Sequence, residues 1–287
     1  MAKPASKPRL LMCPPDHFTV SYQINPWMDT EAWNADPQGW HDRAMREWQA
    51  LRDLYERLGA EVVTVDPVPG QPDMVFTANC ASVLKGRALL ARFRYAERKG
   101  EEPHFAAFFD AAKSAGHIDD VHNVADDVVF EGAGDAVWDP VRKLFWLGYS
   151  KRSSASAADA LRSVFSAEVV PLEMVTERYY HLDVALAPLT GGEVIYIPEA
   201  FGAEGLAALR TRVGDDKLIA ATQADADGFG VNAVNFDRHI ITAFLSAKLR
   251  EELEGRGYEI HVTPLDAFRQ SGGGAFCLTL RLDDPAA

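Results

Sequence analysis

Short apolar runs alternate with amphipathic stretches along most of the chain. Between residues 40 and 58 apolar side chains recur at helical spacing and Gly59 follows, which predicts a helix with a glycine stop. Short apolar or alternating runs bounded by turn residues predict strands. The expected strands cover 9–13, 61–65, 87–93, 128–130, 136–138, 143–148, 168–172, 185–189, 193–197, 217–221, 233–236, 239–242, 259–263 and 278–282. The expected helices cover 40–58, 101–114, 153–166, 200–213 and 246–255.

These elements form a recurring unit of two short strands, a helix and a further strand, at intervals of roughly 50–60 residues. A unit of this kind cannot bury its own apolar face and must pack on its neighbours. A closed ring of such units would gather the strand ends around one central cavity. No linker rich in Pro, Gly or Ser divides the chain, so we expect a flexible leader at 1–8 and one α/β domain at 9–287. A doubly wound α/β sheet is the alternative, and the number of hairpins counts against it.

Charge and cysteine content narrow the class of partner. The chain of 287 residues carries a net charge of −13. It has too little positive charge to neutralise the phosphates of a polyanion, so we do not expect it to bind nucleic acid. No apolar run approaches the ~18 residues that a membrane span needs. With 3 cysteines there is no disulfide framework, which is typical of a reducing, cytoplasmic compartment. We expect a small-molecule partner, and the sequence leaves open a homo-oligomer.

One cysteine has an unusual position. Cys277 follows the run Gly272-Gly273-Gly274, where the backbone can approach a ligand closely. A thiol at the mouth of the strand expected at 278–282 could serve as a nucleophile if a base were near or its pKa were lowered. The alternative is a small buried side chain that follows a turn.

Acidic residues and a histidine occur at other expected strand ends. Glu131 follows an apolar run and precedes two glycines, which suits a carboxylate that faces a pocket. If 179–183 is extended, His181 and Asp183 point to the same face, where a carboxylate could orient an imidazole for proton transfer. A solvated turn and a core histidine are the alternatives. No HExxH, paired CxxC or dinucleotide fingerprint is present, so we expect neither a metal nor a cofactor.

A delocalised cation would suit converging carboxylates, because a guanidinium matches them in fork geometry. Asp73 and Asn79 flank another apolar stretch, where they either face the same pocket or cap turns. Arg92, Arg94 and Arg152 could hold the carboxylate of an amino-acid substrate or could be solvated surface charges.

Five segments in this order resemble the guanidino-group-modifying superfamily of arginine deiminases, dimethylarginine dimethylaminohydrolases, amidinotransferases and arginine dihydrolases. The resemblance extends over about residues 9–282. The segments are Asp73-x-x-Phe76-Thr77-x-Asn79, Phe130-Glu131-Gly-x-Gly-Asp135, Gly148-x-Ser150-x-Arg152-Ser153, His181-Leu182-Asp183 and Gly272-Gly273-Gly274-x-x-Cys277.

The resemblance implies a fold and a set of catalytic roles. The fold would be a five-bladed, pseudosymmetric α/β propeller of ββαβ units around a central active-site cavity. Cys277 would attack the guanidinium carbon and form a covalent thiouronium-like intermediate. His181 would protonate the departing amine and later activate water, while Glu131 and Asp183 would hold the guanidinium and orient the imidazole.

The resemblance also implies substrate contacts. Asp73 and Phe76 would lie on the segment that contacts the substrate. Arg92 and Arg152 would bind its carboxylate.

Residue 79 separates the branches of the superfamily. Where deiminases and amidinotransferases commonly have Arg-Asp, this chain has Ala78-Asn79. The pattern is similar to the arginine dihydrolase branch, which converts arginine to ornithine, ammonia and carbon dioxide. The alternatives are a dimethylarginine dimethylaminohydrolase, an amidinotransferase, and a protein that binds a guanidino ligand without turnover.

Overall fold

The computed structural model describes residues 7–284, so most of the leader expected at 1–8 lies outside the described residues. The strands are β1 (Arg9–Met12), β2 (Glu61–Thr64), β3 (Ala81–Leu84), β4 (Arg87–Leu90), β5 (Asp120–Asn123), β6 (Ala136–Asp139), β7 (Leu144–Tyr149), β8 (Glu168–Glu173), β9 (Leu186–Pro188), β10 (Val194–Tyr196), β11 (Leu218–Ala220), β12 (Val234–Phe236), β13 (His239–Thr242), β14 (Glu259–Val262) and β15 (Leu280–Arg281). The α-helices are α1 (Thr30–Ala35), α2 (Pro37–Arg57), α3 (Ala96–Lys99), α4 (Glu102–Ser114), α5 (Gly132–Asp135), α6 (Ala157–Phe165), α7 (Ala203–Val213), α8 (Gln223–Asp227), α9 (Ala247–Gly255) and α10 (Asp266–Arg269). Short 3₁₀ helices are η1 (Pro72–Val75), η2 (Thr77–Cys80), η3 (Leu182–Val184) and η4 (Pro198–Ala200).

The strands form five small mixed sheets of three strands each. In the sheet β3-β4-β5, the first two strands are antiparallel and the last two are parallel, and the same arrangement holds in β6-β7-β8, β9-β10-β11, β12-β13-β14 and β15-β1-β2. A helical crossover joins the parallel pair in each sheet, as parallel strands require. The expected order of strand, strand, helix and strand is therefore confirmed.

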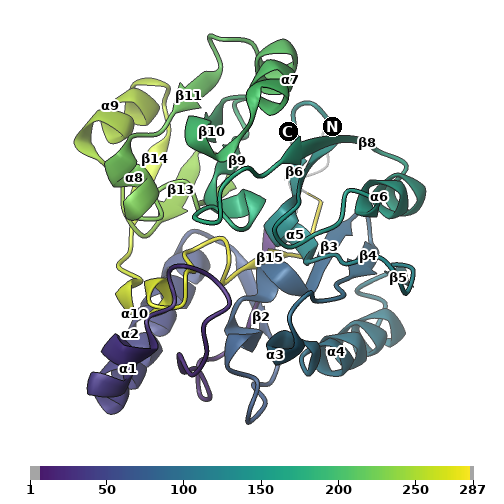
Figure 1. Cartoon of the computed structure of the whole chain (residues 1–287), viewed down its shortest axis with the longest axis vertical. Helices are drawn as coiled ribbons and strands as arrows, with labels where there is room; N and C mark the ends of the chain where they lie inside the picture. Colours follow the sequence, from purple (N-terminus) through teal and green to yellow (C-terminus); the bar gives the residue numbers. More distant parts are fainter. Residues whose placement is uncertain (1–6, 285–287) are drawn as a thin grey trace.

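The first strands of all five sheets line one apolar cavity of about 110 Å³. Its walls include Val83 of β3, Val137 of β6, Ala187 of β9, Val234 of β12 and Leu280 of β15. Figure 1 shows the crossover helices α2, α4, α6, α7 and α9 on the outside of the molecule, with β15 near its middle. The hydrophobic faces of the sheets are thus buried between the shared cavity and the outer helices.

The longest helix shows how the sequence pattern fixes an element. Asp36 caps α2 by accepting a hydrogen bond from the backbone N–H of Gly39, and Pro37 occupies the first turn, where its missing N–H costs nothing. The buried side chains include Trp48, Leu51 and Tyr55, which recur every three or four residues. Among the described residues, no helix is long and apolar enough to span a membrane.

Three sequence expectations were wrong. Residues 128–130 form no strand, and Phe130 makes only a single bridge to Arg92. The segment containing His181 and Asp183 is not extended, because η3 begins at Leu182. The strand expected at 278–282 is reduced to the two residues of β15. Apolar side chains in these places are buried in tight turns rather than in ladders, and hydrophobicity alone does not separate the two.

Candidate active site

The polar residues of the site lie immediately before the first strands of the sheets. Asn79 precedes β3, Glu131 precedes β6, His181 precedes β9, Asn232 precedes β12 and Cys277 precedes β15. Because these five strands line one cavity, the segments that lead into them converge at one end of it. The recurring unit therefore contributes one polar position from each sheet.

Cys277 lies between a carboxylate and an amide. Its thiol donates to Asp183 Oδ2 at 3.2 Å, and Asn232 Nδ2 donates to its Sγ at 3.1 Å. Asn232 Oδ1 accepts hydrogen bonds from the backbone N–H groups of Phe276 and Cys277, which fixes the amide so that its NH₂ faces the sulfur. Burial, followed by the neighbouring Asp183, raises the pKa of Cys277 well above its usual value. The buried sulfur of Cys277 is therefore held as a thiol.

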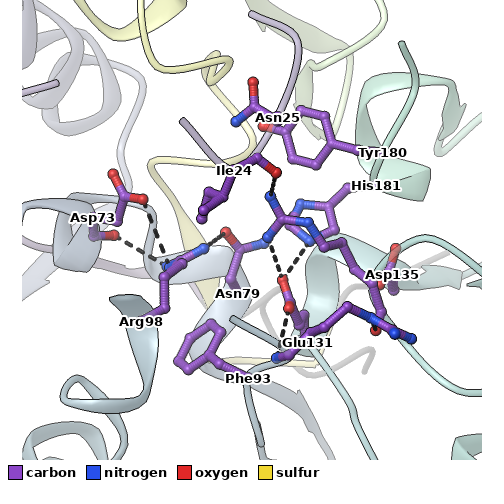
Figure 2. Close-up of polar contacts among 12 residues, drawn as sticks. Ile24, Asn25, Asp73, Asn79, Phe93, Arg98, Glu131, Asp135, Tyr180 and His181 are labelled. Atoms are coloured by element: carbon purple, nitrogen blue, oxygen red, sulfur yellow. Dashed lines mark hydrogen bonds and ion pairs between the residues drawn. The ribbon is translucent and has the colours of Figure 1, made fainter. Parts of the chain in front are cut away.

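His181 is held by Glu131, which also binds an arginine. His181 Nε2 lies 2.8 Å from Glu131 Oε2, and Arg152 Nη1 donates to the same oxygen at 3.0 Å. Burial alone would raise the pKa of Glu131, but the Arg152 guanidinium and the imidazole together bring it well below its usual value. Figure 2 shows Glu131 facing the imidazole across this contact. Glu131 is thus a permanent anion.

Asn79 connects the imidazole to a buried arginine. Arg98 Nη1 donates to Asn79 Oδ1 at 2.8 Å, and Asn79 Nδ2 lies 3.5 Å from His181 Nδ1 (Figure 2). Because Arg98 can only donate, the amide oxygen must face it and the NH₂ must face His181. Nδ1 then accepts, which leaves the ring proton on Nε2 for Glu131. Arg98 is itself held by two bonds to Glu101, at 2.7 and 2.9 Å.

Asp73 and Phe76 border the same cluster. Asp73 accepts from Tyr22 Oη at 3.0 Å and from Ser271 Oγ at 3.4 Å, and its backbone carbonyl accepts from Arg98. Burial raises the pKa of the Asp73 carboxyl. A Cβ atom on Gly273 would lie 2.1 Å from the Phe76 ring, which explains why this turn requires glycine.

The whole cluster is closed to solvent. Asp73, Glu131, His181, Asp183 and Cys277 are each at most 2% exposed. Arg152, also 2% exposed, lies between the rings of Tyr95 and Tyr180 and donates to the backbone carbonyl of Ile24 at 3.0 Å. A substrate must therefore displace part of the chain to reach the thiol.

The predicted arginines differ in their placement. Arg152 lies in the cluster, and Arg94 lies at its border, where its backbone N–H donates to Glu131. The Arg92 guanidinium instead pairs with the exposed Asp126 at 2.5 Å, so the structure does not bring it to the site. A different arginine, Arg98, lies buried in the cluster, where it donates to Asn79.

Sequence reasoning missed Arg98 and Asn232. No motif marks either residue, but the recurring unit marks Asn232, because it stands before β12 where the other sheets supply their polar residue. Arg98 carried no comparable signal. Among the described residues, one cluster of three side chains has the spacing of metal ligands. It lies outside the candidate site and consists of His239, Glu259 and His261. The site itself offers a thiol, an imidazole and carboxylates around a closed centre.

A family model described as N,N dimethylarginine dimethylhydrolase, eukaryotic, matches residues 14–282. The chain is 40% identical over 277 residues to the bifunctional arginine dihydrolase/ornithine cyclodeaminase ArgZ of Synechocystis sp., a match that takes in 96% of this chain and 38% of ArgZ. It is 35% identical over 274 residues to the N(G),N(G)-dimethylarginine dimethylaminohydrolase of Mycobacterium tuberculosis, with 96% and 85% of the two chains matched. The chain spans 38% of the length of ArgZ and of the Nostoc relative AgrE.

Solved structures are similar over the whole described fold. The crystal structure of the N-terminal domain of ArgZ bound to product matches with a TM-score of 0.91 at 39% identity, over 98% of this chain and 99% of that one. A variant of that domain covalently bound to a reaction intermediate also matches with a TM-score of 0.91 at 39% identity, over 97% and 99% of the two chains. A dimethylarginine dimethylaminohydrolase at 18% identity and a TM-score of 0.73 shares the fold.

Proposed function

Because the chain belongs to the N,N-dimethylarginine dimethylhydrolase family, we propose that it is a cysteine-dependent hydrolase of a guanidino compound, with arginine as its substrate. The products are ornithine, ammonia and carbon dioxide. The observation that carries this choice is Asn79, an amide held against the imidazole by Arg98. The 40% identity to a protein named as an arginine dihydrolase supports it.

The first half-reaction forms a carbon–sulfur bond. The substrate guanidinium binds beside Glu131 and Asp183, and its positive charge lowers the cost of ionising the Cys277 thiol. Asp183 Oδ2 already accepts the thiol hydrogen bond and takes that proton. The thiolate attacks the guanidinium carbon, the C–N bond to one terminal nitrogen breaks, and His181 protonates the departing ammonia.

The second half-reaction uses water and returns the thiol. His181 takes a proton from water, the hydroxide attacks the carbon bound to sulfur, and the C–S bond breaks. The first hydrolysis leaves bound citrulline. One further water then breaks its terminal C–N bond and the bond between the carbon and the side-chain nitrogen, so arginine and two waters give ornithine, two ammonia molecules and one carbon dioxide. Asn79 and Glu131 hold the ring of His181 in place during both hydrolyses. The steps use only a thiol, an imidazole, carboxylates and water.

Two buried arginines anchor the substrate carboxylate. Arg152 and Arg98 supply the fixed positive charge of the cluster, and guanidinium groups match a carboxylate in geometry. In this role Arg98 replaces Arg92, whose side chain pairs with Asp126. Asp73 is the carboxylate nearest to Arg98 after Glu101, and it suits the α-amino group of the substrate.

Residues 14–29 form the lid of the site. Tyr22 holds Asp73, the Ile24 carbonyl holds Arg152, and Asn25 Nδ2 donates to the Ser271 carbonyl at 3.1 Å. Trp27 fastens the far end, because its indole N–H donates to the Arg178 carbonyl and its ring packs against Phe229. Breaking these contacts opens the route to Cys277. Because Phe229 packs against Trp27, the segment 222–232 moves when Trp27 leaves.

We also propose that the five sheets are the blades of a five-bladed α/β propeller and that the described residues of the domain expected at 9–287 form one unit, while 285–287 lie outside the described residues. The support is the shared cavity, which the first strand of every sheet lines. The site then lies at one mouth of the central cavity, where all five blades contribute to it.

A dimethylarginine dimethylaminohydrolase is the second candidate. The description of the matching family and the relative from Mycobacterium tuberculosis favour it. It would use the same Cys277 and His181, but it would stop at citrulline after one hydrolysis. The two candidates differ in the first product that leaves and in the number of waters consumed.

Two further functions, amidino transfer and ligand binding without turnover, remain predictions from the sequence that no contact among the described residues favours. An amidinotransferase would pass the carbon from Cys277 to an amine, and a binding protein would hold the ligand without turnover. The cytoplasm is the compartment that we propose, because Cys13, Cys80 and Cys277 are free thiols.

Product analysis by mass spectrometry tests the proposal. The protein is incubated with arginine and, separately, with asymmetric dimethylarginine, and Cys277→Ser is the matched control. Ornithine from arginine that disappears in the control supports the dihydrolase. Citrulline from dimethylarginine alone would assign the protein to the second candidate, and citrulline from arginine would make it a deiminase and remove the proposed role of Asn79. No product from either substrate would contradict the proposal.

A further inference from the structure

A second cluster of ligand-type side chains lies on the parallel strands β13 and β14. His239 on β13 stands directly opposite Glu259 on β14, and His261 follows two residues later on the same face of β14. One nitrogen or oxygen from each of these side chains lies within 4.8 Å of the others. Two imidazoles and a carboxylate are a ligand set for zinc.

Two of the three distances between ligand atoms match a bound ion, and the third is within 4.8 Å. His239 Nδ1 lies 3.2 Å from His261 Nε2 and 3.4 Å from Glu259 Oε2. In a tetrahedral zinc site with bonds of about 2.0–2.1 Å, neighbouring ligand atoms are about 3.3 Å apart. Without an ion, Nδ1 of His239 either shares one N–H between the two atoms or accepts from Nε2 of His261, which leaves Glu259 without a donor from this ring. An ion between the three groups uses each of them once.

The sheet holds the ligands in place before any ion arrives. Backbone pairing fixes the register of His239, Glu259 and His261, and the Asn235 side chain donates to the His239 carbonyl at 2.8 Å. Arg238 does not compete for the site, because its guanidinium bonds the carbonyls of Gly257 and Arg256 and lies over the Tyr258 ring.

The chemical environment also suits a cation. The Glu259 side chain is 68% exposed and that of His239 is 24% exposed, so an ion can enter from solvent and keep a water as its fourth ligand. The net charge of −13 favours its approach.

We propose that His239, Glu259 and His261 bind one divalent transition-metal ion, with Zn²⁺ as the chemically fitting species, and that the ion clamps β13 to β14. The site is separate from the thiol. Asn232 precedes β12, whereas His239 follows the hairpin turn at the other end of that strand. Figure 1 shows β13 and β14 at the side of the molecule, away from β15 near its middle. The clamp therefore acts on stability and not on the chemistry at Cys277.

The amount of metal that the protein retains tests the proposal and does not depend on enzymatic activity. Chelator-treated protein is loaded with Zn²⁺, desalted and analysed for metal, and Co²⁺ loading gives a visible spectrum that reports four-coordination. All measurements are made in the Cys277→Ser background, so that zinc on the catalytic thiol does not contribute. We expect one equivalent of metal and a thermal midpoint that rises with Zn²⁺.

Ligand variants and a matched control decide the outcome. His261→Gln and His239→Gln should each lose the retained equivalent and the thermal shift, and Glu259→Gln should weaken binding at least tenfold. His122→Gln is the control, because His122 is a partly buried strand histidine that lies 3.1 Å from a single carboxylate, Asp120. No retained metal, or equal retention in His239→Gln and His261→Gln, would overturn the proposal and leave a hydrogen-bonded imidazole pair. Circular dichroism of each metal-free variant checks that it is folded.

Discussion

The two halves of the candidate active site use the same kind of carboxylate in opposite ways. The imidazole half consists of His181, Glu131 and Arg152, and the thiol half consists of Cys277, Asp183 and Asn232. Burial acts on both carboxylates. In the imidazole half a guanidinium and an imidazole outweigh it and lower the pKa of Glu131. In the thiol half no cation is in contact, and burial raises the pKa of Asp183 to about 7.

The two carboxylates therefore differ in charge state. Glu131 carries a fixed negative charge, and Asp183 gains or loses a proton near neutral pH. Glu131 stays ionised and orients His181 through a bond of 2.8 Å. Asp183 titrates near neutrality, and its Oδ1 is buried without a hydrogen-bond partner among the described residues. A substrate guanidinium would supply that missing donor and would favour the ionised carboxylate. Pairs of groups with divergent pKa values are typical of acid–base sites.

Removing the nucleophile should have the largest effect. We expect Cys277→Ser to lower kcat by about 10⁴-fold or more, since covalent attack is lost. The fold should survive, because the change is nearly isosteric. Steady-state assays measure the rate, and the thermal midpoint serves as the folding control. Turnover within tenfold of the wild type would exclude the covalent route.

Breaking the fixed charge should affect both activity and stability. Glu131→Gln leaves Arg152 buried without its anion, which should destabilise the fold by about 3–5 kcal/mol and lower kcat by about 10²–10⁴-fold. Since the pKa of Glu131 is lowered on folding, its stabilising contribution is present above the unfolded-state pKa and is lost on acidification. Urea unfolding at pH 7 and pH 4 should therefore show a larger deficit at pH 7. An equal deficit at both would contradict the lowered pKa.

Neutralising the switching carboxylate should have the opposite pH signature. The folded-state pKa of Asp183, about 7, lies above its unfolded value, so wild-type stability from this group is present below about pH 4 and is lost as pH rises to about 7. Asp183→Asn removes that loss. Relative to the wild type, the variant should gain a few kcal/mol between pH 4 and pH 8, with the full ~4 kcal/mol as an upper bound. A relative stability that is flat with pH would place the titration elsewhere.

Changing the amide beside the sulfur should have a moderate effect. Asn232→Asp replaces a donor to Sγ with a second carboxylate, which raises the thiol pKa further and should lower kcat about 10–100-fold. The rate of Cys277 alkylation as a function of pH measures the thiol directly, and its profile should move to higher pH. Asn232→Ala separates the lost donor from the added charge. An unchanged alkylation profile in both variants would remove Asn232 from the site.

The smallest effect should come from Arg92. Its exposed pair with Asp126 contributes only about 0–1 kcal/mol, so Arg92→Ala should change KM by less than about twofold. The matched variant Arg98→Lys loses the fork to Glu101 and with it the fixed donor to Asn79, and it should raise KM and lower kcat together. A large KM effect of Arg92→Ala would restore the substrate role predicted from the sequence.

The sequence predicted the repeat and named most of the residues that the structure brings together in the candidate site, and the failures have identifiable physical causes. Arg92 and Arg98 lie six residues apart, and only the bend between β4 and α3 decides which guanidinium turns inward. The strand β5 was missed because its residues Asp120–Asn123 are mostly polar and carry no alternation. Backbone hydrogen bonds pair β5 with β4, and the side-chain pattern of the sequence does not predict them.

Asn232 was missed for a different reason. The notable motifs combine charged residues with glycines, whereas Asn232 stands among small apolar residues. It could have been found from the repeat, since every other sheet has a polar side chain at the corresponding position. The roles of Glu131 and Asp183 could not be separated from the sequence. The cationic groups beside Glu131 come from distant parts of the chain, and among the described residues Asp183 has no such partner.

The most direct test of the central claim is the mass of the Cys277 peptide after arginine turnover is quenched in acid. His181→Gly is the variant of choice, because it keeps the thiol and removes the group that activates water. Since His181 also protonates the departing ammonia, the adduct should form slowly in this variant, and the incubation with arginine is long. The proposed mechanism predicts an arginine-derived adduct on that peptide, absent from the double variant that also carries Cys277→Ser. Ornithine or citrulline formed by the wild type, with an unmodified Cys277 peptide in His181→Gly and undiminished turnover in Cys277→Ser, would contradict the claim.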